Sequence, residues 1–201
     1  MSGAFLKSVA FGFAIAASIG PIALLIISTA VSHGLRPGCY AAFGAALADL
    51  FYALLAFSAG ALILPRLATH ATAIRTAAAL ILIGFAIYMM FRSAVAQGGN
   101  PAGPRAAGML LPTFLLTLVN PVILVIFAGF VPQLPLAGSL TTAAGLAFGL
   151  FFGSLSVQLA LAVTGSHLRA ALPGRGWRRR ISLAGAAGIL AFGLIGLFSS
   201  T

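Results

Sequence analysis

The chain of 201 residues contains a single acidic residue, Asp49, which lies in the apolar run GAALADLFYALLA at 44–56. A carboxylate at the centre of a bilayer costs on the order of 2.5–3.5 kcal/mol on insertion scales, so an intramembrane acid indicates a functional site. Such a group can load and release a proton, and one charge moved through about 100 mV is worth about 2.3 kcal/mol. Asp49 therefore indicates proton-coupled transport. The alternative is a neutral acid that serves only helix packing.

Two prolines lie at matching places in the two halves of the chain. GPIALLI at 20–26 aligns with NPVILVI at 120–126, an offset of one hundred residues. A proline inside a helix frees the carbonyl four residues back, here those of Ala17 and Thr117. A broken helix also offers a half-helix N-terminus, whose partial positive charge suits a carboxylate. Each proline alone is also explained by a plain kink, but matched breaks indicate a transporter's binding site.

Polar residues near the two breaks and near Asp49 complete the candidate site. Tyr52 lies one turn after Asp49 and is expected to share its hydrogen bonds. Taken singly, each polar side chain at this depth is also what a helix–helix contact would use. The predicted substrate and proton pathway consists of Asp49, Gly20, Pro21, Asn120, Pro121, Ser18, Tyr52, Thr117 and Gln158.

The composition indicates that membrane helices must position these residues. Hydrophobic residues make up 61% of the chain and charged residues 6%, with a mean hydropathy of +1.15. Soluble domains carry about a quarter charged residues, and about 20 apolar residues cross a bilayer as a helix. We therefore predict one all-α transmembrane domain over 1–201 with about six spans, or five if the run cut by Arg75 does not cross. Turn residues separate the predicted helices, which are 6–32, 39–64, 72–92, 107–131, 139–165 and 180–199.

Lysine and arginine are distributed unevenly between alternate loops. Eight lie in the first, third and fifth loops, and the other set holds Lys7, Arg66 and Arg75. Because positive residues stay on the cytoplasmic side, both termini face outward if there are six spans. The apolar run after Lys7 continues to Val31, beyond the 7 to 15 or so residues of a signal peptide's core, so we expect the first span to be retained.

Three spans between the matched prolines make the two halves enter the membrane from opposite sides. We predict a 3+3 inverted repeat with halves of about 1–96 and 106–201, the architecture of many secondary transporters. The small residues around Asp49, mostly alanine over 41–53, allow close helix approach and should place its carboxyl in the bundle interior. The same small-residue faces permit a homodimer.

Other classes of function fit the residues less well. The net charge of +10 lies between apolar runs, where cations set topology and contact anionic lipids, so we expect no nucleic-acid partner. Enzymes need a base, a nucleophile or paired acids within reach, yet Asp49 has no acidic companion and the histidines lie at predicted span ends. We predict no enzymatic activity, metal site or cofactor. A divalent metal-ion exporter, which would want several acids, thiols or imidazoles at membrane depth, and an accessory membrane protein remain alternatives.

Two segments of the chain resemble the LysE/RhtB family of amino-acid exporters, the lysine exporter and homoserine/threonine resistance proteins. They are SIGPIALLIISTAVSHGLRPGCYAAFGAALADLFYALLA and LVNPVILVIFAGFVPQLP, and the likeness in length and hydropathy covers essentially the whole chain. The resemblance implies a small multi-pass protein of the bacterial inner membrane that exports amino acids or related small metabolites by using the proton motive force. Its implied partners are that small-molecule substrate, protons and membrane lipids.

Two positions depart from the family pattern. Family members often read Pro-Gly-Pro where this chain has Ile19-Gly20-Pro21. Many members of the homoserine/threonine branch carry a lysine after Asn-Pro, where this chain has Val122. The missing cation leaves the charge class of the substrate open.

Overall fold

The computed structural model of the chain describes residues 2–18, 20–95, 106–120, 123, 139–171 and 174–198. Every element within these ranges is a helix, which confirms the predicted all-α class. The helices are α1 (Ser2–Ala17), α2 (Pro21–His33), α3 (Leu35–Thr69), α4 (Ala71–Val95), the 3₁₀ helix η1 (Ala106–Met109), α5 (Leu110–Leu118), α7 (Leu140–Ala171) and α8 (Arg175–Phe198).

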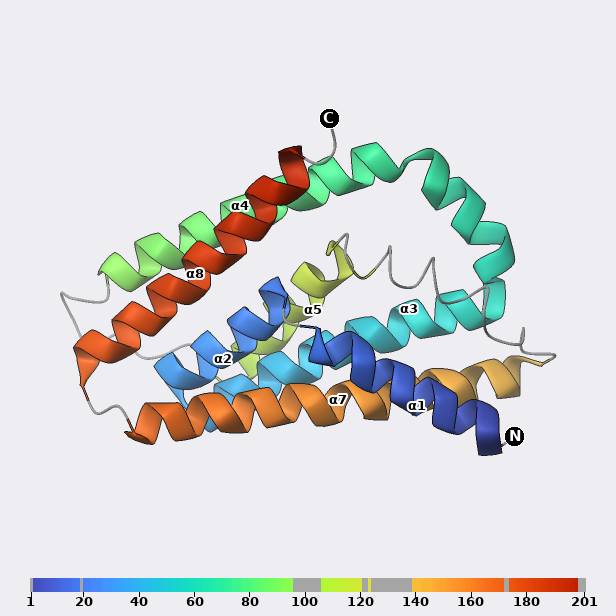
Figure 1. The fold of residues 1–201 in the computed structure, drawn as a ribbon, viewed down its shortest axis with the longest axis horizontal. Helices are drawn as coiled ribbons and strands as arrows, with labels where there is room; N and C mark the ends of the chain where they lie inside the picture. Colours follow the sequence, from blue (N-terminus) through green and yellow to red (C-terminus); the bar gives the residue numbers. More distant parts are fainter. Residues whose placement is uncertain are drawn as a thin grey trace.

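Two groups of long helices enclose two shorter ones (Figure 1). α3 and α7 lie side by side, and α1 packs along α7; α4 and α8 form the second group. The shorter helices α2 and α5 lie between the groups, and α2 packs against α3, α7 and α8. α2 is therefore held inside the bundle by helices from both halves of the chain.

The predicted first span, 6–32, consists of two helices. α1 ends at Ala17, α2 begins at Pro21, and the pair is bent by 70° at the break. Pro21 occupies the first turn of α2, where the missing N–H has no intrahelical partner to lose. Gly20 precedes it in an extended conformation, with φ −128° and ψ −173°. The proline thus begins a new half-helix, and the break is a true interruption.

The second matched segment also interrupts its helix. α5 ends at Leu118, and the N–H of Asn120 donates to the carbonyl of Thr117 at 3.2 Å. The prediction that a proline leaves the Thr117 carbonyl free is wrong, because the last turn tightens and supplies this carbonyl with a closer donor. Pro121, and with it most of the predicted span up to residue 131, lies outside the described residues.

Two of the described helices are long and apolar enough to cross a membrane. They are Leu35–Ser58 within α3 and Leu140–Ala171, and the bent pair of α1 and α2 makes a third if it counts as one span. The apolar stretches Ala79–Phe91 in α4 and Ala106–Leu118 are shorter. The six-span inverted repeat remains a prediction.

Glycines allow several pairs of the described helices to pack with their backbones in contact, among them α3 with α5 and α1 with α7. A Cβ atom placed on Gly44 of α3 would lie 2.3 Å from the carbonyl oxygen of Leu110 in α5. A Cβ atom placed on Gly153 of α7 would lie 2.1 Å from the carbonyl oxygen of Val9 in α1. No side chain fits at either distance, so small residues decide these contacts, as is common between membrane helices.

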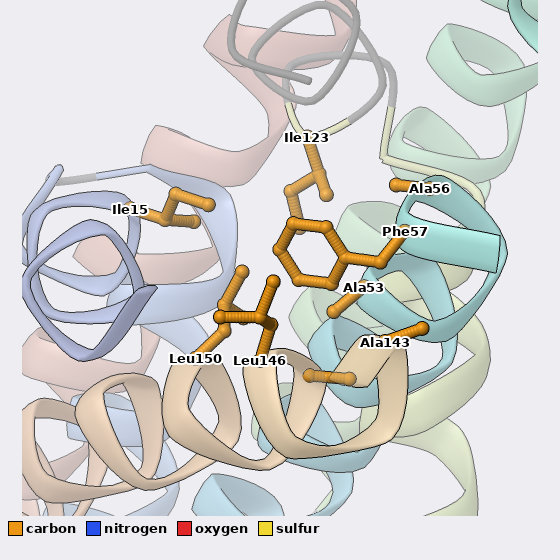
Figure 2. Close-up of a cluster of buried hydrophobic side chains, with 9 residues drawn as sticks. Ile15, Ala53, Ala56, Phe57, Ile123, Ala143, Leu146 and Leu150 are labelled. Carbon is orange, nitrogen blue, oxygen red and sulfur yellow. The ribbon is translucent and has the colours of Figure 1, made fainter. Parts of the chain in front are cut away.

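A buried apolar cluster joins α1, α3 and α7 (Figure 2). Ile15 of α1 faces Leu146 and Leu150 of α7, and Phe57 of α3 lies beneath Ile123. Both isoleucines also line a cavity near the start of α2. The cluster is therefore continuous with the cavity wall.

We expect Gly153→Ala to destabilise the protein by about 1–3 kcal/mol, because the added methyl group overpacks against the backbone of Val9. Gly145→Ala in the same helix is the matched control, since no atom lies within 4 Å of the added Cβ and alanine favours the helix. Thermal unfolding of the two purified variants in detergent measures the difference. Equal melting temperatures would contradict the close packing of α1 on α7.

Candidate functional site

Asp49 lies in the interior of the bundle, with 2% of its surface exposed. The small residues of α3 on either side of it are fully buried against neighbouring helices, as the sequence predicts. These are Ala41, Ala42, Ala45, Ala46, Ala48 and Ala53. Their close packing removes the carboxyl group from the outer surface of the molecule.

Two side chains of α7 face this carboxyl group. Ser154 Oγ donates to Asp49 Oδ2 at 2.5 Å, and Gln158 Nε2 donates to the same oxygen at 3.0 Å. Gln158 Nε2 also donates to Ser154 Oγ at 2.6 Å, which links the three side chains into one network. Asp49 Oδ1 and Gln158 Oε1 are both buried, and no described residue donates a hydrogen bond to either of them. The network therefore holds one oxygen of the carboxyl group, and two buried acceptors remain without a donor among the described residues.

A cavity of about 180 Å³ lies beside this network, where α2 begins. Asp49 and Gln158 line it together with the first turn of α2, residues 20–23. Most of the remaining wall is apolar. The apolar residues of this wall are Ile15, Ala16, Ile26, Ile123, Leu161 and Phe192.

The first turn of α2 contributes hydrogen-bond donors to the cavity. The first bond of the helix runs from the N–H of Leu24 to the carbonyl of Gly20 at 3.2 Å. The N–H groups of Ile22 and Ala23 precede it and have no intrahelical partner. They lie at the positive end of the helix dipole, which favours an anionic group. The cavity thus presents donors on one wall and acceptors on another.

The structure brings most of the predicted pathway residues together around this cavity. Tyr52 is absent from its lining. The hydroxyl group of Tyr52 donates to the carbonyl of Leu118 at the end of α5, and its expected share in the hydrogen bonds of Asp49 stays a prediction. Pro121 lies outside the described residues. The predicted residues that line the cavity are Asp49, Gly20, Pro21, Asn120, Ser18, Thr117 and Gln158.

The predicted pathway omits two residues that matter to the site. Ser154 lies one helical turn before Gln158, and this spacing places both side chains on the same face of α7. That spacing was a usable signal. Phe192 of α8 also lines the cavity, but a single aromatic residue in a membrane helix carries no signal that separates it from its neighbours.

A comparison with known families decides the class of the protein. The model of the LysE type translocator family matches residues 13–199. This chain belongs to the LysE type translocator family. No curated protein and no solved structure matches it. The LysE family member is thus a multi-pass membrane protein of a family that moves small molecules across membranes, and the resemblance noted in its sequence is confirmed.

In this LysE family member, we expect Ser154→Ala to cost about 1–3 kcal/mol, because it removes one of two donors to a buried carboxyl oxygen. Ser156→Ala is the matched control: Ser156 is exposed and donates to the Gly153 carbonyl of its own helix, so its loss should change stability by less than about 0.5 kcal/mol. Chemical or thermal unfolding in detergent compares the two variants. If both melt like the wild type, the Asp49 network does not contribute to the fold.

Proposed function

We propose that the protein exports amino acids or related small metabolites across the bacterial inner membrane, coupled to the proton motive force. The observation that carries this proposal is the pairing, within one cavity, of the free Asp49 Oδ1 with the N-terminal N–H groups of α2. Family membership supports the transport of a small molecule. The arrangement of the cavity supports the finer assignment.

A zwitterionic amino acid matches the polar groups of the cavity. Its ammonium group has three N–H donors, and Asp49 Oδ1 and Gln158 Oε1 are two buried acceptors without donors among the described residues. Its carboxylate suits the N–H groups of Ile22 and Ala23, because a helix N-terminus is a ready anion site. The apolar wall around Ile26 and Phe192 accepts an aliphatic side chain.

The same carboxyl group provides a basis for proton coupling. An isolated carboxylate without a compensating cation is expensive to bury. When the substrate's ammonium group leaves Asp49, a proton can take its place on Oδ1, while Ser154 and Gln158 continue to hold Oδ2. Binding of the substrate and binding of a proton then exclude each other. Exclusion of this kind links export of the substrate to entry of a proton.

The packing of the helices supports the inverted repeat that alternating access would use. In the proposed repeat, the three helical units of the first half are the bent pair α1–α2, then α3, then α4; the second half begins with α5 and continues with α7 and α8. α3 packs on α7 and α4 packs on α8, so the second and third units of each half meet their counterparts. α1 packs on α7 and α5 packs on α3, so the first unit of each half crosses to the second unit of the other. A two-fold relation between halves of opposite orientation produces this exchange of partners.

We expect expression of the protein to make a sensitised bacterial host more resistant to at least one toxic amino acid or analogue. The host should then grow at a higher concentration of that compound. Asp49→Asn should abolish this resistance, because a neutral amide cannot exchange a proton for an ammonium group. Pro21→Ala should weaken it by continuing the helix through the donor groups of α2. Growth on a panel of amino acids and analogues is the first measurement, and Ser156→Ala serves as the control variant.

Efflux of a labelled amino acid from proteoliposomes is the direct measurement. An imposed pH gradient should accelerate efflux by the wild type and have no effect on Asp49→Asn. If no analogue or amino acid is exported, the proposed function is wrong. If export occurs and Asp49→Asn retains its full rate, the transport assignment stands and the assignment of the site is wrong.

A further inference from the structure

Two of the close glycine contacts are counterparts in the two halves of the chain. In one, Gly44 of α3 receives the carbonyl of Leu110, at the start of α5. In the other, Gly153 of α7 receives the carbonyl of Val9 in α1. Val9 and Leu110 match to within one residue under the offset of one hundred that aligns the two breaks. In each contact, the second helical unit of one half receives the first unit of the other at a glycine.

Matching Gly44 with Gly153 gives a sequence alignment of α3 with α7. The segment FGAALADLFYA at 43–53 aligns with FGSLSVQLALA at 152–162, and the two share Phe, Gly, Leu and Ala at equivalent positions. Asp49 follows Gly44 by the same interval as Gln158 follows Gly153. Asp49 and Gln158 are therefore equivalent positions, 109 residues apart.

These two equivalent side chains touch each other. Gln158 Nε2 donates to Asp49 Oδ2 at 3.0 Å, and both residues are at least 95% buried. Residues that are equivalent under a two-fold relation come into contact only next to its axis. The Asp49–Gln158 pair therefore lies where the two halves of the molecule meet, and both members line the same cavity.

We infer that Asp49 and Gln158 form a single binding site for one monovalent cation, a proton or a substrate's ammonium group, and that the site requires one acidic residue at either position of the pair. This inference rests on the proposed function. Each member contributes one free oxygen, Asp49 Oδ1 or Gln158 Oε1. The amide NH₂ group of Gln158 is a hydrogen-bond donor in its ordinary neutral form, so it can donate to the Asp49 carboxylate. A second ionised carboxylate only accepts hydrogen bonds and could not make this bond. Exchanging the two roles keeps the same set of groups beside the axis.

The test moves the acid across the hydrogen bond without changing the length of either side chain. Asp49→Asn alone should lower pH-driven efflux of the transported amino acid by at least about tenfold, the size of one lost charge-assisted hydrogen bond. The double variant Asp49→Asn with Gln158→Glu should restore both the efflux and its dependence on the pH gradient. Thermal unfolding in detergent must show that both variants are folded.

A second double variant separates the equivalent position from any other place in the cavity. Leu161 also lies on α7 and lines the cavity, so Asp49→Asn with Leu161→Asp adds an acid nearby at a position that is not equivalent. This variant should remain inactive. The inference is overturned if it recovers as well as the Gln158→Glu double variant, or if the latter is folded and inactive while the wild type transports. Failure of the wild type itself to transport would instead overturn the proposed function.

Discussion

The burial of one carboxyl group governs how the helices around it are arranged. Asp49 is withdrawn from both water and lipid, and a group of this kind needs donors that are already in place. The alanines of α3 let α7 approach closely enough for Ser154 and Gln158 to supply those donors. The broken helix that begins at Pro21 then places a second set of donors across the cavity. The burial of Asp49 thus depends on three features together: the small residues of α3, the polar face of α7 and the interrupted helix.

The half-helix α2 is fixed at the end away from the cavity. Arg169 of α7 donates through Nη1 to the carbonyls of Val31 at 3.3 Å and Ser32 at 2.5 Å, in the last turn of α2. A cation at this end also complements the helix dipole. Gly34 follows with φ +100°, a conformation that favours glycine, and the chain turns directly into α3. Because α7 carries both Arg169 and Gln158, one helix sets the position of α2 and that of the network around Asp49.

The sequence predicted those features of the site that depend on a single residue type at a single place. A lone acid among alanines implied an interior carboxyl group, and a proline after glycine implied the break that the structure shows between the end of α1 and the start of α2. Features that depend on distances between helices were not predictable. The hydroxyl of Tyr52 bonds to Leu118 because α5 ends beside it, and nothing in the spacing of Tyr52 from Asp49 reveals that neighbour. In the same way, the axes of α1 and α2 are bent by 70° at the break, whereas the apolar pattern of the sequence predicts one continuous span.

Under the proposed inverted repeat, Asp49 and Gln158 are equivalent positions in contact, which bears on how such a chain could arise by duplication. Two identical halves would bring two aspartates to one hydrogen bond, and mutual repulsion would let only one of them ionise. In a symmetric homodimer of such halves, the two carboxyl groups would share one proton. The two halves of a single chain can differ, and a glutamine at one of the two positions removes the repulsion while preserving the contact. Divergence at this pair is thus the change that a single chain allows and a symmetric dimer forbids.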